Sequence, residues 1–296
     1  MTGGLVALAA AGGAGAAGAA IWRRDRDYLA GSLAVALDGP AEPLPRALRL
    51  GYAGLEIALR LDDGGDLRMT AGEPEPLFER AVLAPLAARL TGSTTGRVHR
   101  GSRESFQLLL HLAGGDPHEA YAELDELLGE YGRILTRAIE MRVTPGPVRV
   151  VLVGPGWPRD TIVEQDDRLV FLEYEPKAPA DPRELAPLVT RSLAPLLGWD
   201  PREPWAELPA EARHILRSLV REAHADRRQI RFVDVPDRPR AVRQAFWREL
   251  HAAGADYIGG RDLAALSRFL RGPLPWAGRP HSHRANRPGY APANAQ

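Results

Sequence analysis

Short apolar runs alternate with amphipathic stretches from the thirties to about residue 270 of this chain. Such alternation predicts a parallel sheet whose strands are joined by crossover helices. Eight of the runs have the length and composition of buried strands: Leu33–Leu37, Gly54–Leu59, Phe106–Leu112, Val148–Val153, Leu169–Leu172, Leu188–Thr190, Ile230–Asp234 and Asp256–Ile258. Eight strands are what a (β/α)8 barrel of the TIM type needs. A further segment, Leu67–Ala71, is expected to be the second arm of a hairpin that extends the second strand.

The expected helices carry their own start and stop signals. Asp116 offers an N-cap, Pro117 suits the first helical position and Glu119 can complete the cap, and apolar residues then recur on one face. Another apolar stripe begins at Val242 and ends at Gly254, where a left-handed residue is expected to close the helix. We expect these apolar faces to pack on the barrel as core.

The two ends of the chain differ from the barrel, which we place at residues 28–271. Residues 1–27 form a leader rich in Ala and Gly that is uncharged up to Trp22 and ends in a basic cluster. Its length suits a membrane span, but small residues insert poorly, so an export signal, an anchor and a flexible leader all stay open. Residues 272–296 hold five prolines without apolar periodicity and are expected to be a disordered tail.

Charge and composition exclude some classes of function. Lys plus Arg and Asp plus Glu both number 38, so there is no net field to attract nucleic acid, and no nucleic-acid partner is expected. Cysteine is absent, which excludes disulfides, thiolate nucleophiles and cysteine metal sites. Every basic residue except Lys177 is arginine, a bias typical of a GC-rich genome, so abundant arginine does not by itself indicate an anion site.

Two segments, Pro43–Glu56 and Ile230–Leu270, resemble the superfamily of glycerophosphodiester phosphodiesterases and phosphatidylinositol phospholipase C-like proteins. Within it they look most like the branch of altered inheritance of mitochondria protein 6. The resemblance covers about residues 33–270 and implies a (β/α)8 barrel. It also implies phosphodiester hydrolysis, in which two histidines act as general acid and base and strand carboxylates hold a divalent cation.

The residues at the positions of that site depart from the superfamily's pattern. No histidine occurs before His99, so neither family histidine is present. Glu56 matches the metal-binding glutamate and is the one matched polar position that keeps its residue type. The two histidine positions fall near Asp38 and at Ala71, the second carboxylate position at Ala58, and the acid and lysine of the third strand at His111 and Ala113. Lys177 lies too far downstream to replace the missing lysine.

Glu56 and His111 are the candidate catalytic residues, and Glu56 is the candidate metal ligand. The alternative for Glu56 is an ion pair with Arg60 or Arg231, which the cost of burying an unpaired charge favours. Strand alternation predicts that His111 points inward near the barrel mouth. An acid or base role and a hydrogen-bonded structural role are both open for His111, and the structural role is the more common outcome.

Other groups near the expected strand ends have weaker claims. Glu173 and Glu175 share one face of an extended segment and are possible replacement metal ligands, although loop carboxylates are usually solvated. The tail histidines His281 and His283 are too few for a metal site. The sequence Gly259–Arg261 would follow the last strand as a turn that admits a phosphate to backbone amides.

Three functions are consistent with these residues. The leading hypothesis is a phosphodiesterase-like barrel that has lost most catalytic residues and binds a small phosphodiester-like or other polar ligand, or a protein partner. The second is a phosphoric diester hydrolase that uses His111, Glu56 and Ca²⁺ or Mg²⁺ on glycerophosphodiester or phospholipid-type substrates; otherwise no cofactor is expected. The third is an interaction module associated with a membrane of the cell envelope through residues 1–22. A secreted or envelope location and a cytoplasmic location are equally open.

Overall fold

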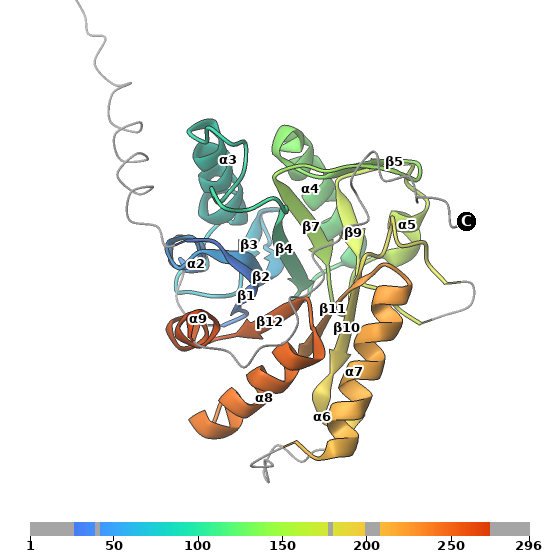
Figure 1. Cartoon of the computed structure of the whole chain (residues 1–296). Helices are drawn as coiled ribbons and strands as arrows, with labels where there is room; N and C mark the ends of the chain where they lie inside the picture. The colour runs from blue at the N-terminus through green and yellow to red at the C-terminus, as the bar shows by residue number, and fades with distance from the viewer. Residues whose placement is uncertain (1–26, 39–41, 177–179, 199–207, 273–296) are drawn as a thin grey trace, which may run out of the picture.

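Parallel strands stand side by side with helices around them in the computed structural model, which describes residues 27–38, 42–176, 180–198 and 208–272 (Figure 1). The strands are neighbours in the order β10, β11, β12, β1, β2, β4, β7, β9. Their bounds are β1 (Leu29–Ala36), β2 (Tyr52–Leu61), β4 (Phe106–Leu112), β7 (Val148–Leu152), β9 (Val170–Leu172), β10 (Leu188–Ser192), β11 (Gln229–Val233) and β12 (Tyr257–Gly260).

The two outermost strands of this order, β9 and β10, meet and close the sheet into a barrel. Glu173 and Leu188 form a parallel bridge. The amide of Tyr174 donates to the carbonyl of Leu188 at 2.7 Å, and the amide of Leu172 donates to that of Leu185 at 2.9 Å. The fold is therefore a (β/α)8 TIM-type barrel, and the fold prediction is confirmed.

The predicted hairpin is also present. Strand β3 (Leu67–Met69) runs antiparallel to the end of β2, with Leu59 opposite Met69 and Leu61 opposite Leu67. The leucines and the methionine alternate with Arg60 and Arg68, so one face of the hairpin packs on the core while the other carries charge.

Most helices lie between two strands in the chain, the last one follows β12, and together they cover the outside of the barrel (Figure 1). Asp116 caps α4 as predicted, because its carboxylate accepts from the amides of His118 at 2.9 Å and Glu119 at 3.0 Å. Helix α8 ends at Gly254, which has a φ of +88°. The bounds are α2 (Pro43–Arg49), η1 (Glu79–Leu83), α3 (Ala84–Thr91), α4 (Pro117–Glu130), η2 (Gly132–Ile134), α5 (Arg159–Val163), α6 (Leu193–Leu197), α7 (Ala210–Ala225), α8 (Arg240–Ala253) and α9 (Leu263–Arg271).

A small second sheet lies at the amino-terminal ends of β7 and β9. Its strands are β5 (Arg137–Ile139), β6 (Arg142–Thr144) and β8 (Asp167–Arg168), all antiparallel. The amide of Thr136 donates to the carbonyl of Val148, the first residue of β7, at 2.7 Å. Ala138 and Val143 pack against the inner apolar cluster of the barrel. The small sheet therefore covers the end of the barrel opposite the mouth.

One turn prediction is wrong. Gly259 and Gly260 are not a turn after the last strand but the end of β12, in register with Leu33 and Ala34 of β1. A Cβ at Gly259 would lie 3.1 Å from a methyl group of Val35, and one at Gly260 would lie 3.2 Å from the Leu266 side chain. The pair of glycines therefore allows close packing around β12, and its amides take part in the sheet.

The ends of the chain, residues 1–26 and 273–296, lie outside the described residues. The expectations of a leader, a membrane association and a disordered tail therefore stay predictions. Within the part of the chain that is described, no helix is both long and apolar enough to cross a membrane.

Candidate functional site at the barrel mouth

Glu56 is an inward-facing carboxylate in the middle of β2 and is only 3% exposed. Its Oε1 lies 2.7 Å from Nε2 of His111, which comes from the end of β4. Its Oε2 lies 2.7 Å from a terminal guanidinium nitrogen of Arg231, which comes from β11. Each carboxylate oxygen therefore already has a partner from the protein.

The neighbours of Glu56 decide its charge. Burial alone would raise the pKa of this carboxyl group, because water no longer solvates the charged form. The positive charge of Arg231 and the hydrogen bonds from His111 and Arg231 outweigh burial and lower the pKa to about 2. Glu56 is thus ionised at neutral pH, and since a carboxylate only accepts hydrogen bonds, His111 donates through Nε2.

Arg231 places a permanent cation inside the barrel. The side chain is 4% exposed, and its Nε donates to Oγ1 of Thr190, on the neighbouring strand β10, at 2.9 Å. Of the two arginines that the sequence offered as partners of Glu56, Arg231 is the one that binds it. Its guanidinium faces the carboxylate that the sequence resemblance singled out as a candidate metal ligand.

His111 lies at the mouth with part of its ring accessible, since its side chain is 27% exposed. The ring packs against Gly154, in the loop after β7. A Cβ at this position would lie 2.9 Å from Nδ1 and 3.4 Å from Cε1 of His111, and Gly154 has a φ of +73°. Both the space and the backbone conformation therefore require glycine here.

The loop after β7 holds this arrangement in place. The amide of Gly154 donates to a carboxylate oxygen of Glu173 at 2.9 Å, and the indole of Trp157 donates to the carbonyl of Leu110 at 3.0 Å. Arg159 donates to the carbonyl of Glu173 at 3.0 Å and forms an ion pair with Asp181. The loop and β9 enclose a cavity of about 70 Å³ that Gly154, Trp157, Arg159 and Glu173 help to line.

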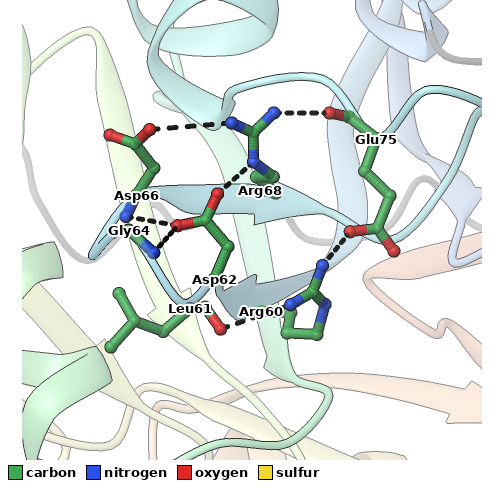
Figure 2. A network of polar contacts seen from close by, with 7 residues as sticks. All are labelled: Arg60, Leu61, Asp62, Gly64, Asp66, Arg68 and Glu75. Carbon is green, nitrogen blue, oxygen red and sulfur yellow. Dashed lines mark hydrogen bonds and ion pairs between the residues drawn. The ribbon is translucent and has the colours of Figure 1, made fainter.

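The β2–β3 hairpin and the segment after it are joined by a network of charged groups (Figure 2). Arg60 reaches Glu75 at 2.5 Å, so it is not available to Glu56. Arg68 pairs with Asp62 and donates to the carbonyl of Glu75 at 3.1 Å. These contacts hold the segment after β3 against the hairpin. The same segment borders a wide hollow of about 580 Å³ lined by Asp38, Thr70, Gly72, Glu73 and Glu75.

The other positions that the sequence resemblance singled out are Asp38 and three alanines. Ala58 lies opposite His111 in the pairing of β2 with β4, and Ala71 is buried at 2% exposure. The amide of Ala113 continues the strand by donating to the carbonyl of Leu59 at 2.8 Å. Asp38 pairs with Arg261 at 2.8 Å across the loops that follow β1 and β12.

The candidate metal ligands do not come together. Glu173 accepts from a backbone amide, and Glu175, which is 58% exposed, lies 3.6 Å from Arg159. Within the described ranges no three His, Asp or Glu side chains are arranged to hold a metal ion. With both oxygens of Glu56 engaged, the residues present do not fit a divalent cation. Lys177, His281 and His283 lie outside the described residues.

Sequence reasoning missed two groups that shape the site. Thr190 is the polar end of a predicted strand, and its place opposite Arg231 follows only from the pairing of β10 with β11. Gly154 begins the run Gly154-Pro155-Gly156, which signals a turn but does not reveal the histidine beside it.

Comparison with known proteins adds little to this geometry. No profile of a known protein family matches the chain, and no curated protein does. Among solved structures, S. officinalis PLC21 is similar with a TM-score of 0.44 and 11% sequence identity, over 83% of this chain and 34% of that one. The chain thus spans about a third of the length of that structure. The order of the strands, and not this likeness, establishes the barrel.

Proposed function

We propose that this barrel binds a polar ligand at its mouth and does not cleave phosphodiesters by the metal-dependent route of the superfamily that it resembles. The observation that carries the proposal is the engagement of both Glu56 oxygens, one by His111 and one by Arg231. Ca²⁺ takes six to eight oxygen ligands and Mg²⁺ a near-octahedral set, often with several waters. Here the carboxylate of Glu56, the candidate metal ligand, is already neutralised by a guanidinium.

Electrostatics supports the same proposal. A divalent ion bound to Glu56 would lie near the guanidinium of Arg231, with its charge of the same sign. Two unit charges about 4 Å apart repel by roughly 4 kcal/mol at the effective dielectric constant of a protein, and a double charge makes the repulsion twice as large. Ala58 replaces the second strand carboxylate, so the repulsion is not offset at that position.

A space for a ligand lies at the loops that follow β1 and β3. The hollow bordered by Asp38, Thr70 and Glu75 is large enough for a small molecule. Its lining is polar, which suits a ligand with hydroxyl or other hydrogen-bonding groups. His111 is the partly exposed member of the group that it forms with Glu56 and Arg231. Such a ligand would contact the barrel interior through His111.

A second function, phosphoric diester hydrolysis, is favoured by one observation. His111 is held by a carboxylate at 2.7 Å and remains 27% exposed, which is the arrangement of an oriented acid or base. In this version Nδ1 would exchange a proton with the substrate while Glu56 fixes the ring. This alternative needs a second group to protonate the leaving alkoxide.

A hydrolysis assay separates the two functions. The purified chain is incubated with glycerophosphocholine and with bis(p-nitrophenyl) phosphate, in Ca²⁺, in Mg²⁺ and in EDTA, beside a heat-killed sample. We expect no turnover above the heat-killed sample in any condition. Turnover that is lost in both His111→Ala and Glu56→Gln would instead establish the hydrolase. The same compounds are then tested as ligands by thermal shift, where the binding proposal expects a rise in Tm that His111→Ala removes.

A further inference from the structure

The end of the barrel opposite the mouth contains a layer of polar side chains. Gln107 and Arg149 are partners in the pairing of β4 with β7, near the start of both strands. Gln229 and Tyr257 are the first residues of β11 and β12, and the Gln229 amide donates to the Tyr257 hydroxyl oxygen at 2.8 Å. The small sheet of β5, β6 and β8 covers this layer, which we call the barrel floor.

Arg149 lacks a counter-ion on the barrel floor. Its Nε is fully buried and has no hydrogen-bond partner within the described residues. Among the residues that the structure describes, the side chain forms no ion pair and contacts the ring of Phe171, with Cζ 5.5 Å from the ring centroid. A contact with an aromatic face attracts the charge but accepts no N–H in the guanidinium plane. Burial lowers the pKa of Arg149, and the charge of Glu104, which is not in direct contact, offsets this only in part.

Tyr257 offers a second donor in the same place. The side chain is 2% exposed, and its oxygen accepts from Gln229, but the described residues supply no acceptor for its own O–H. Burial raises its pKa, so the hydroxyl keeps its proton. Phe171, whose ring Arg149 contacts, belongs with Tyr257 to the same inner cluster of the barrel, so the two donors reach the same part of the interior.

We propose that the barrel floor is a binding site for a small oxyanion, phosphate or carboxylate, held by Arg149 with the hydroxyl of Tyr257 as a second donor. Buried donors in proteins are almost always satisfied, and a buried charge is almost always paired. An oxyanion supplies both the missing acceptors and the missing negative charge, and a guanidinium matches its geometry with two parallel N–H groups. Arg149 keeps partial exposure, so the site can be reached from solvent.

Thermal unfolding in different sodium salts tests this site, independently of any ligand at the mouth. Tm is measured in phosphate, sulfate and acetate at matched ionic strength, with chloride as reference. We expect a saturable rise of about 2–4 °C in at least one oxyanion. The phosphate and acetate series distinguish a phosphate site from a carboxylate site.

Variants assign the response to the floor. Arg149→Met removes the guanidinium but keeps an unbranched apolar side chain, so it is expected to fold and to lose the anion response. Tyr257→Phe is expected to reduce the response, and Arg142→Met, an exposed arginine on the neighbouring hairpin, is expected to retain it in full. The proposal is overturned if no oxyanion gives a saturable rise in the wild-type chain, or if the rise persists in Arg149→Met.

Discussion

Arg231 and Glu56 form an ion pair inside the barrel, with 2.7 Å between the guanidinium and the carboxylate and with both side chains 4% exposed. Such a pair is a weak source of stability, because the two charges lose their hydration. Removing one partner is different, since the other charge is then left buried and uncompensated. Substituting one member of the pair should therefore destabilise the fold more than substituting both members.

Substitutions in this pair are expected to be strongly coupled. Arg231→Met should lower the free energy of unfolding by about 3–5 kcal/mol, because it removes the cation that compensates the buried carboxylate of Glu56. The double variant Arg231→Met/Glu56→Gln should recover at least about 1 kcal/mol of that loss. Urea titration measures each value. Arg60→Met is the matched control, since its partner Glu75 is 31% exposed, and it should cost no more than about 1 kcal/mol. An equal loss of free energy of unfolding in Arg231→Met and Arg60→Met would contradict this prediction, because the buried pair would then matter no more for stability than the exposed one.

The ion pair also predicts a dependence of stability on pH. The folded-state pKa of Glu56 is about 2, below the value of 4.5 for an unperturbed carboxyl group. A lowered pKa gives stability that is present above the unfolded value and is lost as the pH falls toward the folded value. The stability difference between wild type and Glu56→Gln should therefore be largest near pH 7 and shrink below about pH 4.5. Unfolding curves at a series of pH values measure this difference, and a difference that stays constant down to pH 3 would contradict the account.

Gly154 should be intolerant of a side chain for a reason that involves His111. Gly154→Ala is expected to cost about 1–2 kcal/mol for its left-handed backbone and about 1–3 kcal/mol more for the contact with the ring. Gly96→Ala is the control for the backbone cost alone, because Gly96 has a φ of +62° and nothing within 4 Å of the added Cβ.

The steric part of that cost can be isolated. In a His111→Ala background the added methyl at position 154 meets no ring, so Gly154→Ala should cost only as much as Gly96→Ala. Chemical denaturation of Gly154→Ala, His111→Ala, the double variant and Gly96→Ala gives the comparison. A cost at position 154 that does not change when His111 is removed would mean that the ring and the loop are not coupled.

The eight strands were predictable because each contains a short apolar run with buried residues. Phe106–Leu112 matches its predicted bounds, and the other runs differ from theirs by a few residues. Sequence gives the strand ends less well, because hydrogen bonding to neighbours decides them. Leu29–Ala36 begins four residues earlier than expected, since Leu29 already bonds to Gly51.

The small sheet and the glycine pair depend on tertiary contacts that periodicity does not report. Strand β5 is three residues long and β8 is two, too short to show a pattern. Gly259 and Gly260 have the composition of a turn, but the close approach of Val35 and Leu266 makes them strand residues.

The residues of the candidate site could be proposed from the sequence, but the contacts between them could not. Strand alternation indicated that His111 faces inward, and the cost of a buried charge indicated an arginine partner for Glu56. The choice of Arg231 over Arg60 depends on barrel closure, which brings β11 across from β2, and on Glu75, which takes Arg60. Neither fact can be obtained from spacing along the chain.

Calorimetric titration with Ca²⁺ tests most directly the proposal that Arg231 neutralises Glu56 and thereby prevents a metal ion from binding. The wild-type chain at pH 7 should show no saturable binding at millimolar Ca²⁺, and its Tm should not change. Mg²⁺ should behave in the same way. Saturable binding of Ca²⁺ by the wild-type chain that disappears in Glu56→Gln would contradict the account, because it would show that Glu56 holds a metal ion despite its partners.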